Sequence, residues 1–547
     1  MIALLTAFWL MVLCGCGPVY YKNDADQEVY DILYRKHRVV FDSRERYAIE
    51  RLAADPLENL DPADSPILEL PDGFIRAERP PLIISLAAAL EIAVYNNREY
   101  QTEKERVYLV ALALTGERNA FSAQFSSLLT AFYENTNDDE FLSATSEVGV
   151  SRLLETGASI GINLSSEFLR FLTGDPRRTA ASILAVSVVQ PLWRGAGRQI
   201  VTEDLTQAER DVVYSIREFS RFKKAFAVSV ASDYFRVLEQ RVVVRNEQRN
   251  YRTLMRGRSR AEMLARAGRL PEFQVDQAKQ DELRAKDRWI LALEQYYRQL
   301  DRFKLTLGVP ADAHVDLDDG DLDRMMGQGI RHPELSRDRA VALALENRQD
   351  LKVTRGRVAD ARRKIAVAEN NLYAQIDLVA EGRVPSRSKT RPFDFQPDRT
   401  EWLAGLEADL PLERTAERNA YRASLIGLDR ANRDLSLKID EIKLEVRNDW
   451  RSLLQARASY DIQKSSVDLA RRRVESTSLF LQAGRADTRD VLESQSALVD
   501  AENALIRALT DHTVLRLELF RDIGLLSIGS HGMWDPVDIS RTDAPDS

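Results

Sequence analysis

Two very long stretches without proline constrain this chain more than any other feature of its sequence. No proline occurs between Pro191 and Pro271, and none occurs between Pro411 and Pro536. Because proline breaks the interior of a helix, each stretch can be helical over most of its length. A helix over residues 198–266 would be roughly 100 Å long at a rise of 1.5 Å per residue.

The same turn occurs inside both stretches. Two similar segments, 216 residues apart, are AGRLPEFQVDQAK at 267–279 and AGRADTRDVLESQ at 483–495. Gly268 and Gly484 are suited to end a helix, because glycine adopts the left-handed conformation found just past a helix end. Pro271 suits the first position of the returning helix, and Asp487 suits an N-cap. The sequence therefore predicts two long helical hairpins with similar tips.

The returning helices carry apolar side chains at alternating spacings of three and four, which is the pattern of a left-handed coiled coil. Over 272–307 these residues are Ala285, Trp289, Ala292, Tyr296, Leu300, Phe303 and Leu307. Over 488–523 they are Leu498, Ala501, Leu505, Ala508, Leu515 and Leu519, with His512 filling the gap. We expect His512 to be a packed core residue.

A shorter helix and a β-rich region precede each hairpin. Helical patterns over 85–118 and 338–373 share an Asn-Arg pair, at Asn97-Arg98 and Asn347-Arg348. After each helix the period changes to about two, which predicts strands. The predicted strands are 121–136, 141–154, 157–172 and 179–192 in the first half, and 374–384 and 400–412 in the second half, on either side of a loop at 384–399.

These patterns describe one unit present twice: a helix, strands, a very long helix, a tip and a returning helix. The expected organisation is an N-terminal segment 1–16, a lightly structured extension 17–81, a first repeat 82–310, a linker 311–335, a second repeat 336–526 and a loose tail 527–547. A few strands in one chain would leave unpaired sheet edges. The simplest solution is a barrel that several copies of the chain share.

The N-terminal segment has the features of a lipoprotein signal. It is apolar over about 13 residues, which fits a signal peptide and is too short for a membrane-spanning helix. Leu13-Cys14-Gly15-Cys16 resembles a bacterial lipobox, in which Cys16 would be acylated. No basic residue precedes the apolar run, and Cys at the middle position departs from the usual pattern. A buried N-terminal helix is the alternative.

Together, the lipobox, the duplication, the strand regions and the two long hairpins resemble the TolC-type outer-membrane efflux family. The resemblance covers roughly residues 82–526, and its order of segments is more specific than any single motif. It implies a mainly α fold with a membrane β-barrel portion: a trimer with a 12-stranded barrel and an α-helical periplasmic tunnel. It also implies a lipid-anchored location in a Gram-negative-type outer membrane, with a periplasmic adaptor protein and an inner-membrane pump as partners.

The resemblance assigns roles to the hairpin tips. Residues that correspond to adaptor-docking turns are Gly268, Arg269, Leu270, Gly484, Arg485 and Ala486. Asp490 and Glu493 match positions where the family places acidic rings that constrict the closed tunnel, and their spacing of three puts them on one helical face. The alternative is a pair of solvated carboxylates that the helix dipole favours.

Other positions depart from the family pattern or are ambiguous. Around the closed gate, the polar lock found in relatives is replaced by Leu481, Ala486 and Gln274, so the closed state would be held differently. The junctions after the β regions are QPLWRGAGR at 190–198 and ADLPLERTAER at 408–418. Their candidate membrane-interface residues are Pro191, Trp193, Gly195 and Pro411, with ordinary core as the alternative for Trp193. Gly195 and Gly197 superficially suggest a phosphate loop, but the residues that would follow in such a loop are missing.

The sequence predicts neither catalysis nor a cofactor. The histidines, His37, His314, His332, His512 and His531, have no metal-ligand spacing, and no nucleophile motif is present. A net charge of −8 disfavours a general nucleic-acid surface. Two functions remain: a passive exit duct for efflux or type I secretion, or a non-conducting coiled-coil lipoprotein that spaces the envelope. The strands favour the duct, and the sequence does not name the exported substrate.

Overall fold

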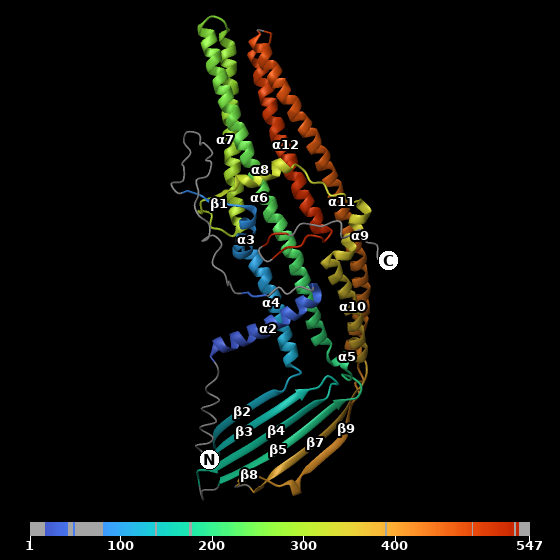
Figure 1. Ribbon diagram of the computed structural model, residues 1–547. Helices are drawn as coiled ribbons and strands as arrows, with labels where there is room; N and C mark the ends of the chain where they lie inside the picture. Colours follow the sequence, from blue (N-terminus) through green and yellow to red (C-terminus); the bar gives the residue numbers. More distant parts are fainter. Residues whose placement is uncertain are drawn as a thin grey trace. The chain divides into compact units, whose positions relative to one another are not determined.

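The computed structural model describes residues 17–41, 47–49, 80–136, 139–173, 178–388, 391–483, 485–529 and 532–534. The chain divides into two compact units (Figure 1). The first, here the sheet unit, comprises residues 1–47, 106–217 and 352–436. The second, here the hairpin unit, comprises residues 48–105, 218–351 and 437–547. Cys16 and the rest of the expected signal segment lie outside the described residues.

The sheet unit contains one antiparallel sheet of seven strands. Its first four neighbours in order are β2 (Gln124–Asn135), β3 (Glu140–Leu153), β4 (Ser159–Phe171) and β5 (Arg178–Pro191). β7 (Gln375–Ser388) pairs with β5, and β9 (Glu401–Asp409) and the short β8 (Arg391–Phe395) both pair with β7. Six strands are therefore long, whereas a 12-stranded trimeric barrel needs four strands per chain.

The four strands predicted in the first half are present, but the second half differs from the prediction. The sequence predicts a loop at 384–399, whereas β7 continues to Ser388 and β8 lies within that segment. Pro385 pairs with Ile183 of β5 and lies beyond Arg383, the last residue that pairs with β9, so its missing N–H interrupts no ladder with β9. The short 3₁₀ helix η2 (Pro397–Arg399) precedes β9.

The duplicated short helices have the same construction in both repeats. In the first repeat α3 (Leu86–Asn96) is followed by α4 (Arg98–Asn119), and in the second α9 (Arg337–Asn347) is followed by α10 (Gln349–Asn370). The helices have 11 and 22 residues in both cases. The predicted single helices are thus each broken in two.

This geometry corrects the alignment of the repeats. Each break is one extended residue, Asn97 with φ −65° and ψ 126°, and Arg348 with φ −64° and ψ 125°. Asn97 therefore corresponds to Arg348 and not to Asn347, the residue that the shared Asn-Arg pair indicates. The backbone conformation, and not residue identity, determines the equivalence.

Two long hairpins follow these helices. The first consists of α6 (Glu203–Arg266, 64 residues) and α7 (Glu272–Leu307), preceded by the single turn α5 (Arg198–Val201). The second consists of α11 (Thr415–Gln482, 68 residues) and α12 (Thr488–Asp522). The prediction of one helix over 198–266 is thus correct except for a break at Thr202. Pro271 is the N-cap of α7, whereas the sequence predicts it at the first helical position.

All seven apolar residues predicted along 272–307 are buried. Along α12, Ala501, Ala508, His512 and Leu519 are buried, whereas the predicted core residues Leu498, Leu505 and Leu515 are only half-buried. The buried face of α12 also includes Ile506, Leu509, Val514 and Leu517. It is therefore wider than the seam of a two-stranded coiled coil, because α12 packs against more than one neighbouring helix.

Smaller elements lie in the predicted extension and in the predicted linker. The extension 17–81 contains a 24-residue helix, α2 (Pro18–Phe41), whose Val29, Ile32 and Leu33 are buried, so this part is not lightly structured. The linker 311–335 contains β6 (Val315–Leu317), paired in parallel with β1 (Leu82–Ile84), and α8 (Asp319–Gln328). Within the described ranges, no helix is long and apolar enough to cross a membrane.

Candidate functional sites

The two faces of the sheet differ in chemistry. Directly paired residues of adjacent strands project to the same face, and successive residues along a strand project to opposite faces. One face carries mainly short or charged side chains, including Ser126, Glu147, Gly149, Asn163, Ser187 and Glu381, although Leu128, Phe132, Ile183 and Leu403 also lie on it. The other carries large apolar side chains, namely Phe125, Leu129, Tyr133, Leu142, Val148, Ile160, Ile162, Val186, Leu378, Trp402 and Leu406.

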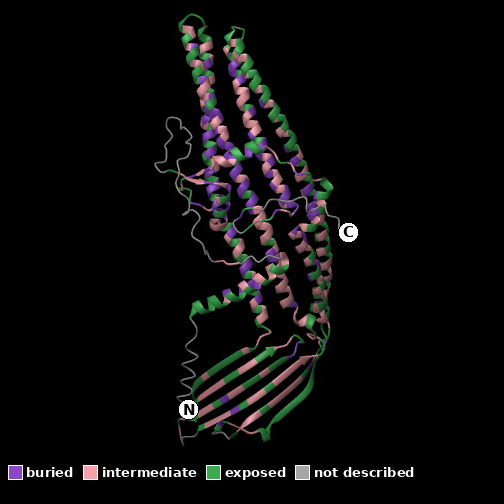
Figure 2. Cartoon of the chain, viewed as in Figure 1, coloured by how far each residue is buried: buried purple, intermediate pink, exposed green. Residues whose placement is uncertain are grey.

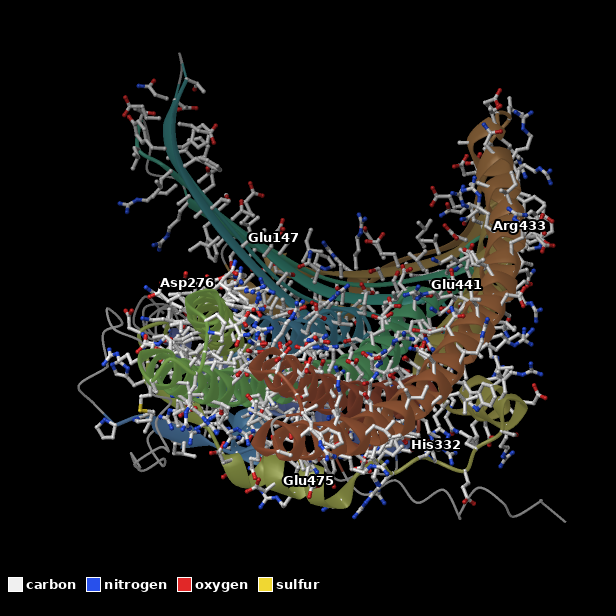
Figure 3. All side chains as sticks on the ribbon, turned by 90° about the horizontal axis from the view of Figure 1, so that it is seen from above. Glu147, Asp276, His332, Arg433, Glu441 and Glu475 are labelled. Atoms are coloured by element: carbon white, nitrogen blue, oxygen red, sulfur yellow. The ribbon has the colours of Figure 1, made fainter. Side chains whose placement is uncertain are left out.

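Every one of these apolar side chains is more than a third exposed. In Figure 2 the strands are coloured exposed or intermediate over most of their length, and Figure 3 shows the curvature of the sheet, with Glu147 labelled. A row of serines, Ser146, Ser166 and Ser182, crosses this face. An exposed apolar face marks a surface that contacts lipid or another protein. The sheet is therefore suited to separate an apolar environment from a polar one.

The junction that follows β5 contains a second group of predicted residues. Trp193 is 56% exposed in the single chain, and its ring stacks on that of Tyr373 with centroids 6.1 Å apart. The Asn370 amide fastens this turn, because its Oδ1 accepts from the Gly195 backbone N–H at 2.8 Å. Gly195 and Gly197 have φ of 75° and 95°, so these glycines allow a sharp bend.

Close packing also restricts this junction. The turn between β3 and β4 contains Gly157, with φ 95°. A Cβ atom there would lie 2.7 Å from the Gly195 carbonyl oxygen. The predicted residues Pro191 and Pro411 lie at the end of β5 and after β9, and exposed Leu192, Leu410 and Leu412 accompany them. These exposed apolar side chains are consistent with an interface position.

The first hairpin tip is closed by a Schellman motif. The Gly268 N–H donates to the Ala265 carbonyl and the Arg269 N–H donates to the Leu264 carbonyl, both at 2.9 Å. Gly268 has φ 68° and open space around it. Gly268 and Arg269 are exposed and Leu270 is half-buried.

The second tip repeats the longer bond of this motif. The Arg485 N–H donates to the Phe480 carbonyl at 2.8 Å. Arg485 is exposed and Ala486 is half-buried, whereas Gly484 lies outside the described residues. The two tips therefore share this hydrogen bond, and each presents an exposed arginine. Adaptor docking by these residues stays a prediction.

The two carboxylates predicted to form a ring lie just beyond the second tip. Asp490 is exposed, and its Oδ2 accepts from the backbone N–H of Asp487, the N-cap of α12, at 3.1 Å. Glu493 forms an exposed ion pair with Arg473, 3.3 Å apart. Between them, buried Leu492 packs against Leu254 and Ala285. Within one chain, Asp490 therefore acts as a capping residue. The acidic ring of Asp490 and Glu493 concerns several copies of the chain and stays a prediction.

Sequence reasoning did not identify the helix breaks as sites. At the first break the Asn97 side chain donates to the Thr306 carbonyl at 2.8 Å and caps α4 by accepting from the Tyr100 N–H at 2.9 Å. Gly308, at the end of α7, lies so close that a Cβ atom would be 2.4 Å from the Asn96 carbonyl oxygen. Gly524 packs in the same way on Asn347 at the second break. The 216-residue offset between these glycines equals that of the tips.

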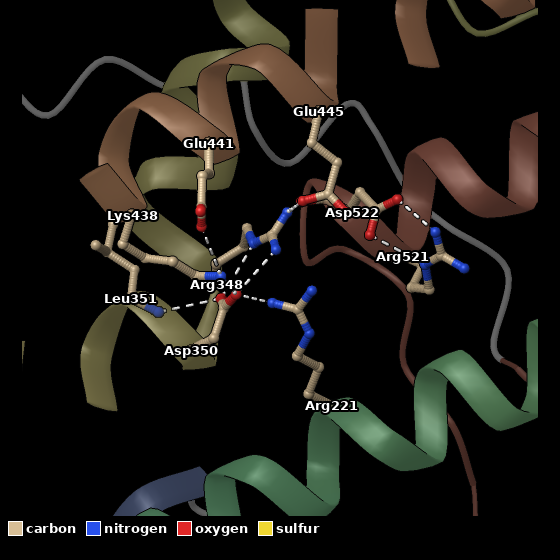
Figure 4. Close-up of polar contacts among 9 residues, drawn as sticks. All are labelled: Arg221, Arg348, Asp350, Leu351, Lys438, Glu441, Glu445, Arg521 and Asp522. Carbon is tan, nitrogen blue, oxygen red and sulfur yellow. Dashed lines mark hydrogen bonds and ion pairs between the residues drawn. The ribbon is translucent and has the colours of Figure 1, made fainter. Parts of the chain in front are cut away.

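A cluster of ion pairs holds the second break (Figure 4). Arg348 is buried and donates from its Nη2 to Asp350 at 2.9 Å and from its Nη1 to Glu445. Asp350 is also paired with Arg221 and with Lys438, whose Nζ is 3.2 Å away. These charges come from α6, α10 and α11, so the cluster joins three helices at the break.

A carboxylate pair lies beside this cluster. Burial, and then the negative charge of Asp522, raises the pKa of Asp449 to about 7. Arg521 binds Asp522 through its Nε and Nη2 atoms, with the closest contact at 2.6 Å. Asp449 therefore binds a proton more readily than an ordinary aspartate does.

The fold brings together two histidines that are 180 residues apart. His332 Nδ1 and His512 Nε2 are 3.3 Å apart, and His512 is fully buried, as predicted. Burial, followed by the charges of His332, Arg516 and Arg457, lowers the pKa of His512 to about 4. Burial and Arg457 also lower the pKa of His332. The surrounding arginines disfavour a cation between the rings, and no group of three potential metal ligands occurs in the described parts of the chain.

The fold is that of outer-membrane channels. The structure is similar to VceC from Vibrio cholerae, with a TM-score of 0.59 and 14% identity over 80% of this chain and 96% of that one. It is also similar to CmeC from Campylobacter jejuni, with a TM-score of 0.58 and 12% identity over 87% of this chain and 97% of that one. The MtrE channel of Neisseria gonorrhoeae, solved in its open state, gives a TM-score of 0.58 with 13% identity over 80% of this chain and 88% of that one.

The second repeat matches a family model. Residues 340–524 match the family model described as outer membrane efflux protein. This is the family that the sequence resembles, and the resemblance is thereby confirmed. No curated protein matches the chain.

Proposed function

We propose that this protein is the outer-membrane channel of a tripartite efflux or type I secretion system. The observation that carries the proposal is the sheet, with one polar face and one exposed apolar face, in a chain that also has two long helical hairpins. Three copies would close the sheets into a barrel in the outer membrane and the hairpins into a periplasmic tunnel. The channel would be passive and would perform no catalysis.

The ends of this duct would have separate roles. Acylated Cys16 would anchor the chain, and Trp193 with Tyr373 would lie at the membrane interface, where amphipathic aromatic rings are enriched. Six tips in a trimer would dock a periplasmic adaptor and so couple the duct to an inner-membrane pump. Exposed Arg269 and Arg485 offer charged donors for acidic or polar groups on that adaptor.

The gate would involve Asp490 and Glu493. Three copies that converge on an axis would concentrate negative potential and attract cations. Within each chain, the ion pair with Arg473 would oppose the movement of Glu493 towards the axis. Because Arg473 and Glu493 are both largely exposed, we expect their pair to be weak, on the order of 0–1 kcal/mol.

Single-channel conductance in a planar bilayer tests the proposal. The wild-type protein is expected to form cation-selective pores, and Asp490→Asn/Glu493→Gln is expected to reduce that selectivity. Glu475→Gln, an exposed carboxylate on α11, is the matched control and should leave selectivity unchanged. If the double substitution leaves the cation selectivity of the pores unchanged, the channel proposal stands and the acidic ring is refuted. Folded trimers without pores in both variants would favour the envelope-spacing lipoprotein.

A further inference from the structure

The sheet contains two more long strands than a four-stranded contribution to a barrel requires. The hairpin of β3 and β4 lies between β2 and β5, and these four strands are paired without interruption. β3 and β4 have 14 and 13 residues, against 12 and 14 for β2 and β5. About 9–11 tilted residues suffice to cross a membrane as a β-strand. The hairpin therefore reaches the full height of the wall.

The hairpin also has the same two faces as its neighbours. Its apolar face carries Leu142, Val148, Ile160 and Ile162; Leu142 pairs with Tyr133 of β2 and Ile162 pairs with Val186 of β5. Its polar face carries Glu147, Gly149, Gly161 and Asn163. An extracellular loop would have no reason to keep an apolar face in register with membrane strands. We infer that β3 and β4 are part of the barrel wall, and that three copies of six strands form an 18-stranded barrel.

This inference rests on the proposed function, and it makes the exit wider than the resemblance implies. At a strand spacing of 4.8 Å and a tilt near 40°, the backbone diameter is about 24 Å for 12 strands and about 36 Å for 18. Barrels of 16–18 strands leave an aqueous channel. Inward side chains about 5 Å long would reduce the wider lumen to roughly 25 Å.

The lining of the added strands keeps this lumen open. A hollow of about 510 Å³ lies on the polar face, and its lining includes the short or absent side chains of Ser126, Gly149, Ser151, Gly161 and Ser187 together with the longer Leu128, Glu147 and Glu381. A Cβ atom on Gly149 or Gly161 would lie 2.9 Å from a serine hydroxyl. Such a lumen would pass bulky hydrated solutes or an extended polymer. It would exclude a folded domain of about 100 residues, whose radius of gyration is about 13 Å.

Disulfide cross-linking across the sheet edges tests how many copies of the chain close the barrel, and removal of the hairpin, below, tests how many strands each copy contributes. Both natural cysteines lie within residues 1–16, so introduced cysteines are the only ones in the rest of the chain. β2 and β9 are the two edges that must meet between copies. Leu129→Cys on β2 would be combined in turn with Trp402→Cys, Ala404→Cys, Leu406→Cys or Ala408→Cys on β9, all on the apolar face. The scan allows for any register between copies.

We expect at least one pair to cross-link the protein in membranes into a species no larger than three chains. Leu129→Cys with Gly405→Cys is the matched control, because residue 405 projects to the opposite face. A largest species of two chains would mean a barrel of 12 strands and would overturn the inference. The absence of any cross-link in pairs that still form pores would also overturn it, while leaving the channel in place.

Removal of the hairpin gives an independent measurement. Deleting residues 137–175 joins the outer ends of β2 and β5, which already run antiparallel to one another. Three copies would then form a 12-stranded barrel. We expect pores that admit only smaller polyethylene glycols from the side of the strand loops than wild-type pores do. An unchanged size limit would refute the role of the hairpin in the wall. Pores in neither protein would instead contradict the proposed channel.

Discussion

Replacing Gly308 by alanine tests the close packing of α7 against the first helix break. Two effects are expected. Alanine at φ 74° costs about 1–2 kcal/mol because its Cβ is strained in the left-handed region. The new Cβ would also meet the backbone of Asn96 and Asn97 at 2.4–2.8 Å. Backbone cannot move aside as a side chain can, so overpacking adds about 1–3 kcal/mol.

Gly268→Ala is the matched control for the first effect. Gly268 has a similar φ of 68°, but a Cβ atom added there would have no neighbour within 4 Å, so only the conformational strain of about 1–2 kcal/mol applies. Gly524→Ala should fall between them, because its Cβ would meet the Asn347 Cβ at 2.9 Å. The expected order of destabilisation is Gly268→Ala, then Gly524→Ala, then Gly308→Ala.

Hydrogen exchange followed by mass spectrometry measures these effects locally. This choice matters because a chain of this size does not unfold in one step. An additional 1–3 kcal/mol at the Gly308 site corresponds to exchange roughly 5- to 150-fold faster in peptides around residues 86–100 than the strain alone would cause. If Gly308→Ala increases exchange around residues 86–100 no more than Gly268→Ala increases exchange at the first tip, the close approach of Gly308 to Asn96 and Asn97 is refuted.

Three further perturbations follow from buried polar groups. Tyr108→Phe removes the hydroxyl that donates to buried Asp26 at 2.6 Å. The packing of α2 should be destabilised by about 1–3 kcal/mol, and α2 should be cleaved more readily by protease. Asp31→Asn, at an exposed ion pair, should have little effect. His512 has a folded-state pKa of about 4, below its unfolded value. Its contribution to stability is therefore present above about pH 6.5 and is lost as the pH falls towards 4. His512→Gln should reduce the fall in the thermal unfolding midpoint between about pH 7 and 5. Asp449 has a folded-state pKa of about 7, above its unfolded value, so its contribution to stability is lost as the pH rises through 7. Asp449→Asn should therefore raise the thermal unfolding midpoint at about pH 8 more than at about pH 6. An equal change at both pH values would contradict the raised pKa.

Local patterns in the sequence were sufficient for the helical part of the fold. Proline-free stretches predicted α6 and α11, and glycines with the turn residues that follow them predicted the tips within one residue. The seam on α7 was correct at every position because that helix buries a single narrow face. On α12 the prediction was incomplete because a wider face is buried, which depends on how many neighbours surround the helix.

Single-residue breaks escaped the sequence analysis. Asn97 and Arg348 are of different types and are both helix-compatible, so nothing local distinguishes them from the residues beside them. Each break is stabilised by side chains or backbone far away in the chain, such as Thr306 for Asn97 and Glu445 for Arg348. The pairing of His332 with His512 was missed for the same reason.

The sequence by itself determined the periodicity of each segment, the duplication and the family resemblance, because these depend on short-range spacing and on composition. Only the tertiary structure decided that the four strands predicted in the first repeat pair with those of the second repeat in one sheet with two distinct faces. It also decided which charged and polar residues meet at the helix breaks. Those features depend on register and packing between segments that are distant in the chain, and local propensity contains no information about either.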